Sequence, residues 1–255
     1  MKTKSGTLYG IGVGPGDPEL IPVKAVNIIG TVGIIYTAAS SKNDYSLAVE
    51  IARPYIPPSA AIHAMSFPMS KDPQVKQRAW QQHARQIVET LKSGQNAAFL
   101  TLGDPLTYST YGYIVRHILE VWPQAPVVTV PGISSFQAAA AATNTPLVEG
   151  DESLLIVSGV HGGERLRALA ASVENVVCLK AYRNMQSICD TLEETGLAQG
   201  SVSVANCSRK EEKIYYDLQA LANERPNYWT LIIAKQQPDV ASKNSERVKA
   251  HDETA

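Results

Sequence analysis

Short apolar segments alternate with segments of helical periodicity along the first half of the chain. Four apolar runs of strand length, each bounded by glycine, proline or serine, occur at residues 8–13, 33–37, 62–67 and 97–101. Helical patterns occur at residues 19–29, 44–51, 75–92 and 111–121. Because strands and helices that alternate along a chain build layered α/β domains, we expect such a domain here.

Two prolines interrupt this pattern within residues 122–126, where neither flanking element can continue. A second series follows, with strands expected at 127–130, 154–158, 176–180, 201–206 and 229–234 and helices at 134–142, 164–172 and 185–194. From Gln236 onward the chain is polar and charged, which is typical of a disordered tail. We therefore predict an N-terminal α/β domain over residues 1–122, a C-terminal α/β domain over 123–235 and a disordered tail over 236–255.

Composition narrows the class of protein. The 255 residues include 44% hydrophobic and 18% charged residues, which is ordinary for a globular protein with buried cores. Lysine and arginine (23) nearly balance aspartate and glutamate (24), so a general nucleic-acid binder is not expected. Three scattered cysteines and five dispersed histidines predict neither a disulfide framework nor a metal site. The lack of a signal peptide and of a long apolar run predicts a cytoplasmic protein without a membrane span.

Three loops, each of which follows a predicted strand, contain the candidate functional residues of the chain. The first reads Gly-Ile-Gly-Val-Gly-Pro-Gly-Asp-Pro from Gly10, the second Thr-Leu-Gly-Asp-Pro from Thr101, and the third Pro-Gly-Ile-Ser-Ser-Phe from Pro131. Ligands of open α/β sheets bind at the carboxyl ends of strands, so all three are candidate ligand loops. The local alternatives are a tight turn for the first, an ordinary turn with Asp104 as acceptor for the second, and an N-cap at Ser134 for the third.

The first loop does not fit a dinucleotide-binding turn. Its glycine spacing differs from G-x-G-x-x-G, and Pro15 and Pro18 lack the N–H groups that a phosphate needs. The following strand also carries no acidic residue at its end. A ligand lined by backbone contacts, without a phosphate, agrees better with these residues.

Taken together and in this order, the three motifs closely resemble the tetrapyrrole (corrin and porphyrin) methyltransferases, and the resemblance covers residues 8 to about 235. It implies a two-domain α/β enzyme, usually a homodimer, with S-adenosylmethionine bound in the cleft between the domains. Within the family, the chain looks most like the members that methylate C20 of precorrin-2 or cobalt-factor II in cobalamin biosynthesis. The features that suggest this are the extended first loop up to Val26, residues 40–46, residues 67–69 and the Tyr-Ser-Thr-Tyr-Gly-Tyr run from Tyr108.

The resemblance also implies which residues form the sites. Matching the family pattern one position at a time predicts these cofactor contacts: Pro15, Leu102, Gly103, Asp104, Thr107, Ser134, Ser135, Tyr182 and Cys207. Tyr182 and Cys207 depart from the family pattern, which has methionine at the first position and glycine or alanine at the second. Asp104 is the one candidate for a catalytic or orienting role, and its alternative role is to cap a turn or bind the cofactor.

The implied substrate carries eight carboxylates, so basic side chains should gather where it binds. The candidates for substrate contacts are Arg183 first, then Arg53 and Tyr108, and the further candidate cations are Lys42, Arg78, Arg116 and Lys180. Methyl transfer from a sulfonium depends on alignment, so we expect no catalytic triad and no protein-bound metal. The competing hypotheses are methylation at another ring position, a nicotinamide-dependent oxidoreductase, and a tetrapyrrole carrier without activity.

Overall fold

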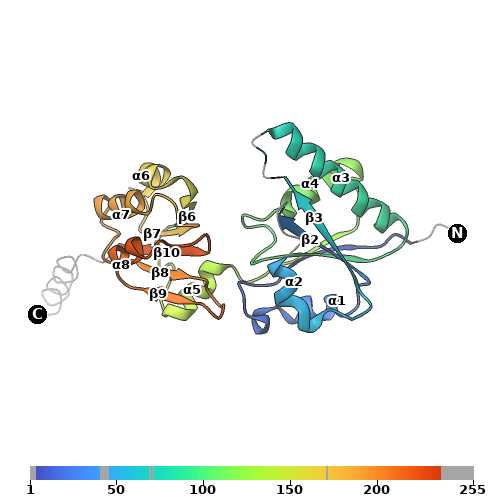
Figure 1. Cartoon of the computed structure of the whole chain (residues 1–255), viewed down its shortest axis with the longest axis horizontal. Coiled ribbons are helices and arrows are strands. Elements are labelled where there is room, and N and C mark those ends of the chain that lie inside the picture. The colour runs from blue at the N-terminus through green and yellow to red at the C-terminus, as the bar shows by residue number, and fades with distance from the viewer. Residues whose placement is uncertain (1–3, 41–45, 69, 71, 171, 237–255) are drawn as a thin grey trace, which may run out of the picture. The chain divides into compact units, whose positions relative to one another are not determined.

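The computed structural model describes residues 4–40, 46–68, 70, 72–170 and 172–236, and the chain divides into two compact units after Ser135 (Figure 1). Each unit is an α/β domain with its own five-stranded sheet, which confirms the predicted fold class. Three predicted features lie outside the described residues: Lys42 with most of its loop, Met69, and the tail from residue 237.

The first unit is a parallel sheet with the strand order β3-β2-β4-β1-β5. Its strands are β1 (Leu8–Gly12), β2 (Ile34–Ser40), β3 (Ala61–Phe67), β4 (Ala97–Thr101) and β5 (Val127–Val130). Its helices are α1 (Val23–Ile29), α2 (Leu47–Ala52), α3 (Pro73–Lys92) and α4 (Tyr111–Val121), with short 3-10 turns at Pro18–Leu20 and Arg53–Tyr55.

Helices cover both faces of this sheet, with α3 and α4 on one side and α1 and α2 on the other (Figure 1). Successive strand residues point to opposite faces, so neighbours in sequence belong to different cores. Ile35 and Leu100 pack with α1 and α2, whereas Tyr36 and Phe99 pack with α3 and α4. Burial on both faces explains why these strands read as continuous apolar runs.

Helix α1 begins later than the sequence pattern predicts. The predicted helix starts at residue 19, but the chain makes a 3-10 turn at Pro18–Leu20 and enters α1 only at Val23. Ile21 precedes Pro22 and has an extended ψ of 128°, because a proline ring disfavours helical backbone in the residue before it.

The predicted domain boundary after residue 122 differs from the division in the structure. Strand β5 pairs in parallel with β1, with Leu8 opposite Val127, so residues 127–130 complete the first sheet. Pro126 accepts a hydrogen bond from the backbone N–H of Leu8 at 2.9 Å. The proline-rich segment is therefore a turn that ends α4 and returns the chain to the same sheet.

The second unit contains a mixed sheet with the order β6-β7-β10-β8-β9. Its strands are β6 (Leu154–Ser158), β7 (Asn175–Leu179), β8 (Val202–Ala205), β9 (Lys213–Tyr215) and β10 (Thr230–Lys235). Its helices are α5 (Ser135–Thr143), α6 (Glu164–Ala170), α7 (Met185–Glu194) and α8 (Leu218–Asn223), with a 3-10 turn at Gly159–His161. Strand β10 is antiparallel to both β7 and β8, and a core of α6, α7 and α8 residues packs on this sheet.

Candidate active site

The strand order of the first sheet brings the three sequence motifs together. Strands β4, β1 and β5 are adjacent and parallel, so the loops that follow them leave the same edge side by side. These are residues 102–110 after β4, 13–17 after β1 and 131–134 after β5, called the three-loop site below. Gly14 and Gly103 form a backbone bridge, in which the N–H of Gly103 donates to the carbonyl oxygen of Gly14 at 2.8 Å.

Glycines allow the three loops to touch backbone to backbone. A Cβ on Gly132 would lie 2.2 Å from the carbonyl oxygen of Gly103 and 2.8 Å from Gly12. A Cβ on Gly12 would lie 2.4 Å from that same oxygen. Gly103 also has a φ of +66°, which L-residues other than glycine rarely adopt. The site is therefore built from close contact of main chains, and larger residues at these positions would separate the loops.

Asp104 ties the second loop to the third. Its Oδ2 accepts a hydrogen bond from the N–H of Gly132 at 3.2 Å, and its Oδ1 accepts from the N–H of Leu106 at 2.9 Å. The hydroxyl of Thr107 also donates to Oδ1, at 3.1 Å. Both carboxylate oxygens are thus engaged by protein donors: Oδ1 caps the turn, which is the alternative role that the sequence offers for Asp104, and Oδ2 joins two loops.

The other cofactor contacts predicted in the first unit lie on the same three loops, except Ser135, which begins α5. Pro15 and Ser134 are buried, and Leu102 and Ser135 are half-buried. Tyr108 is 55% exposed and has a φ of 51°, an unfavourable conformation for a tyrosine. The hydroxyls of Thr101 and Ser109 are 2.9 Å apart and hold the last part of the second loop against the end of β4.

Tyr111 supports the three-loop site from below, a role that its sequence position did not reveal. It is fully buried, and its ring fills the space above Gly10, where a Cβ would lie 1.9 Å from the ring carbon Cζ. Its hydroxyl lies 3.0 Å from that of Thr129 on β5. Burial raises the pKa of this phenol, so it stays protonated at neutral pH.

The two cofactor contacts predicted in the second unit, Tyr182 and Cys207, follow neighbouring ends of its sheet. Tyr182 follows β7, and its ring makes an edge contact with Tyr228 at 5.6 Å between centroids. Cys207 follows β8 and is buried, which raises the pKa of its thiol to about 11. A neutral, buried thiol is a small apolar contact rather than a nucleophile at neutral pH.

The candidate cations of the described chain occur in both units. The guanidinium of Arg183 lies over the Tyr182 ring at 5.1 Å, and that of Arg116 over Tyr113 at 5.7 Å. Arg53 is exposed in the turn after α2, and Tyr55 of that turn donates to the carbonyl oxygen of Pro18 at 3.4 Å. The turn that carries Arg53 therefore packs against the end of the first loop.

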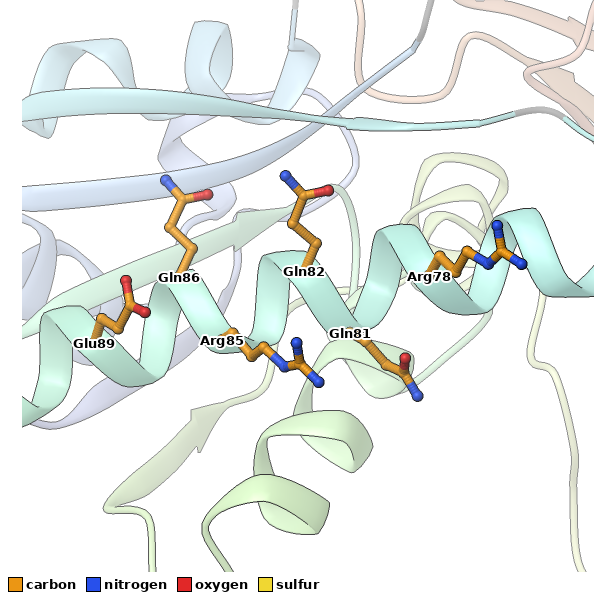
Figure 2. Close-up of a pocket in the computed structure, with 6 residues that line it drawn as sticks. All are labelled: Arg78, Gln81, Gln82, Arg85, Gln86 and Glu89. Carbon is orange, nitrogen blue, oxygen red and sulfur yellow. The ribbon is translucent and has the colours of Figure 1, made fainter.

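A shallow pocket along α3 is separate from the three-loop site. Figure 2 shows Gln82 and Gln86 projecting from one side of this helix and Gln81 and Arg85 from the other. Arg78 and Glu89 complete its lining. Because this lining comes from α3 alone, the pocket adds nothing to the three loops.

Two kinds of feature are absent from the part of the chain that the structure describes. No described helix is long and apolar enough to span a membrane. Within the same residues, no group of three or more histidine, cysteine, aspartate or glutamate side chains is placed to hold a metal ion.

Comparison with known proteins identifies the family. Residues 7–222 match the family model described as Tetrapyrrole (Corrin/Porphyrin) Methylases. The chain belongs to this family. The resemblance predicted from the three motifs is confirmed, and the protein is a methyltransferase of the tetrapyrrole methylase family.

Several similar proteins are named as C(20)-methyltransferases of precorrin-2 or cobalt-precorrin-2. A cobalt-precorrin-2 C(20)-methyltransferase of Salmonella typhimurium is 29% identical over 239 residues, covering 93% of this chain and 99% of that protein. A precorrin-2 C(20)-methyltransferase of Sinorhizobium is 27% identical over 235 residues, 89% of this chain and 94% of that one. A probable cobalt-precorrin-2 C(20)-methyltransferase of Methanocaldococcus jannaschii is 38% identical over 150 residues, covering 59% and 63% of the two chains.

Solved structures share the fold of this methylase. A cobalt precorrin-4 methyltransferase has a TM-score of 0.69 at 21% identity and covers 90% of this chain and 94% of its own. A uroporphyrin-III C-methyltransferase of Thermus thermophilus, complexed with S-adenosylhomocysteine, has a TM-score of 0.64 at 24% identity and covers 90% and 97%.

Proposed function

We propose that this methylase transfers a methyl group from S-adenosylmethionine to C20 of precorrin-2 or cobalt-factor II in cobalamin biosynthesis. The observation that carries the proposal is the three-loop site, in which three sequence motifs far apart in the chain meet through the contacts of Gly12, Gly103 and Gly132. The C20-methyltransferase names of relatives along nearly the whole chain support this choice of ring position.

The residues of the three loops fit the proposed cofactor. The contacts of Gly12 and Gly132 leave main-chain atoms, rather than bulky side chains, at the carboxyl edge of the sheet. Backbone N–H and C=O groups can hold the amino-acid and ribose parts of such a ligand, and the buried Pro15 offers an apolar wall. S-adenosylmethionine carries no phosphate, so a loop that has lost N–H donors at its prolines is compatible with it.

The chain contributes mainly position and exclusion of water. When bound, S-adenosylmethionine would supply an activated methyl group to the ring carbon, and that carbon would lose its proton to solvent. The leaving group is then a neutral thioether, which needs no acid. Asp104 acts as a positioning residue, because its two oxygens fix the second loop against the third. Alignment of this kind accounts for much of the rate in a displacement reaction.

Isotope labelling tests the reaction and its ring position. The enzyme is incubated with S-adenosylmethionine labelled with ¹³C in the methyl group and, separately, with precorrin-2 and cobalt-factor II. We expect a product that has gained the mass of one methyl group, with the ¹³C signal at C20. A label at another ring carbon would replace the C20 assignment with the nearest alternative, and absence of any labelled product from both substrates would contradict the proposal.

Calorimetry separates the proposal from the oxidoreductase alternative. We expect S-adenosylhomocysteine to bind and NADH not to bind, because the first loop lacks the donors that a pyrophosphate requires. The reverse result would contradict the proposal. The family resemblance further implies a cytoplasmic homodimer, and light scattering after gel filtration should give the mass of two chains.

A further inference from the structure

One edge of the second sheet gathers aromatic rings and cations from three different loops. Strand β10 is antiparallel to β7 and β8, so its start lies beside their ends, with Leu231 opposite Leu179 and Thr230 opposite Ala205. Side chains after β7, after β8 and before β10 therefore meet at this edge. We call the following set the cation–aromatic surface: Lys180, Tyr182, Arg183, Arg209, Tyr228 and Trp229.

The rings of this surface are in contact with one another. Tyr228 lies between the other two, with its centroid 5.6 Å from that of Tyr182 and 5.0 Å from that of Trp229, both in edge arrangements. Tyr228 is 42% exposed and Trp229 is 41% exposed. Large aromatic side chains left open to solvent in one group are typical of a ligand or partner surface.

A cation lies over each of the three rings. Besides Arg183 over Tyr182, the ammonium of Lys180 lies 5.4 Å from the centroid of Tyr228, and the guanidinium of Arg209 lies 5.7 Å from that of Trp229. A ring attracts a cation without neutralising its charge. The contacts therefore position three positive charges above aromatic rings.

The backbone beneath this surface is fixed. The N–H of Ala181 donates to the carbonyl oxygen of Thr230 at 2.9 Å, and that of Asn206 donates to Trp229 at 3.1 Å. Lys180 has a φ of 59° and Asn206 a φ of 54°, left-handed conformations that cost free energy in residues other than glycine. Such conformations persist where the surroundings hold them, and they are frequent at ligand sites.

We propose that the cation–aromatic surface binds the tetrapyrrole substrate, with Arg183 and Arg209 on its carboxylates and the exposed rings against the apolar edge of its macrocycle. This inference rests on the proposed function. Guanidinium groups bind carboxylates in a fixed two-point geometry, and aromatic rings pack on conjugated rings. The cofactor fits the charge less well, because a sulfonium and an ammonium outweigh its one carboxylate. The family resemblance assigns Tyr182, a member of the same surface, to the cofactor.

Steady-state kinetics of single variants test this surface. Arg209→Gln removes one charge of the surface, and Arg165→Gln, on the exposed side of α6 in the same unit, is the matched control. We expect Arg209→Gln to raise the KM for the tetrapyrrole about tenfold, the usual loss for one charge-assisted hydrogen bond, with the KM for S-adenosylmethionine unchanged. Arg209→Lys should recover part of the loss. Arg165→Gln should behave as wild type.

Two further measurements keep the test decisive. Trp229→Leu should weaken tetrapyrrole binding without removing a charge, and Arg183→Gln replaces Arg209→Gln if that variant does not fold by circular dichroism. The surface is contradicted if Arg209→Gln or Arg183→Gln matches the control, or if either raises the KM for the cofactor instead.

Direct binding distinguishes failure of this inference from failure of the proposed function. Calorimetry with uroporphyrin III, a porphyrin with eight carboxylates, measures binding without turnover. If wild type methylates no tetrapyrrole but binds uroporphyrin III, and the arginine variants lose that binding, the proposed function fails and the surface stands. If wild type methylates its substrate and the variants bind and react normally, the surface fails alone.

Discussion

Asp104 and three glycines account for the geometry of the three-loop site at the scale of single residues. The carboxylate of Asp104 accepts hydrogen bonds from main-chain donors on two loops. Gly12, Gly103 and Gly132 let those loops approach to contact. The carboxylate of Asp104 and the three glycines thus act together, and a substitution at either kind of residue tests its contribution alone.

Asp104→Asn separates a positioning role from proton transfer. Asparagine keeps one oxygen for Leu106 but places an amide N–H₂ toward the N–H of Gly132, so we expect kcat/KM to fall about ten- to hundredfold. The pH profile of kcat should keep its shape, because no titrating group is lost from the chemical step. Asp72→Asn, which changes a similar cap at the start of α3, should leave kcat unchanged and alter stability by less than about 1 kcal/mol, because asparagine caps a helix about as well as aspartate. A changed pH profile in Asp104→Asn would instead show proton transfer.

Gly132→Ala tests the backbone contact. The added Cβ would meet the Gly103 carbonyl oxygen at 2.2 Å, and main chain cannot move aside as a flexible side chain can. We expect a loss of about 1–3 kcal/mol in the free energy of unfolding and weaker binding of S-adenosylhomocysteine. Gly112→Ala, in α4 with nothing within 4 Å of the new methyl, should be neutral or stabilising by about 0.5–1 kcal/mol. Urea unfolding and calorimetry of both variants test this expectation, and equal stabilities of the two variants would contradict it.

The buried thiol of Cys207 predicts a pH dependence of stability. Its pKa is raised from 9.0 to about 11 in the folded chain, so between these values the unfolded chain holds fewer protons. Stability from this group is therefore complete below about pH 9 and is lost as pH rises toward 11. In urea unfolding from about pH 8 to about pH 10, Cys207→Ala should show a shallower decline than wild type, by up to about 1.4 kcal/mol per pH unit. Parallel curves would rule this out.

At the scale of elements, the packing of α4 on β1 couples the site to the core. Tyr111 begins α4, fills the space left by Gly10 on β1 and reaches Thr129 on β5. One side chain therefore connects a helix with two of the three strands that carry the loops. The same contact explains why Gly10 is needed in the middle of a buried strand, where glycine otherwise weakens a sheet.

A double-mutant cycle measures this coupling. Gly10→Ala alone should destabilise the protein by about 1–3 kcal/mol, because its Cβ would meet the Tyr111 ring at 1.9 Å. Tyr111→Leu alone should also destabilise, since it leaves a cavity. In the double variant, the smaller side chain makes room for the methyl group, so the combined loss should be less than the sum by more than about 0.5 kcal/mol. Additive losses in urea unfolding would mean that the ring and the glycine act independently.

At the scale of the whole molecule, each unit has its own cores. The first has one core on each face of its sheet, and the second has one under α6, α7 and α8. Units with separate cores can unfold in separate steps.

The proposed segregation of charge also concerns the whole molecule, because a protein with a net charge of -1 would place three cations on one edge of the second sheet.

Tryptophan fluorescence can resolve the two steps. Trp80 and Trp122 lie in the first unit and Trp229 in the second, so the fluorescence of Trp229→Phe reports the first unit alone. We expect its urea transition to differ in midpoint from the transition seen by far-ultraviolet circular dichroism, which reports both units. Coincident midpoints and slopes would show that the chain unfolds as one cooperative body.

The sequence by itself determined the local features of this protein. The inner strands β1, β2 and β4 are largely buried apolar runs, so their own residues predict them without reference to neighbours. The three motifs could likewise be recognised from the sequence, because glycine, proline and aspartate act through their own backbone preferences. Their order along the chain was enough to indicate the family, which residues 7–222 confirm.

Only the tertiary structure decided which of these pieces meet. The pairing of β5 with β1, the mixed directions of the second sheet and the short strand β9 depend on contacts between distant segments. The bond from Gly132 to Asp104 and the contacts among Tyr182, Tyr228 and Trp229 depend on them as well. Local propensity does not predict such contacts, because they arise from the order in which strands lie side by side rather than from the residues within each strand.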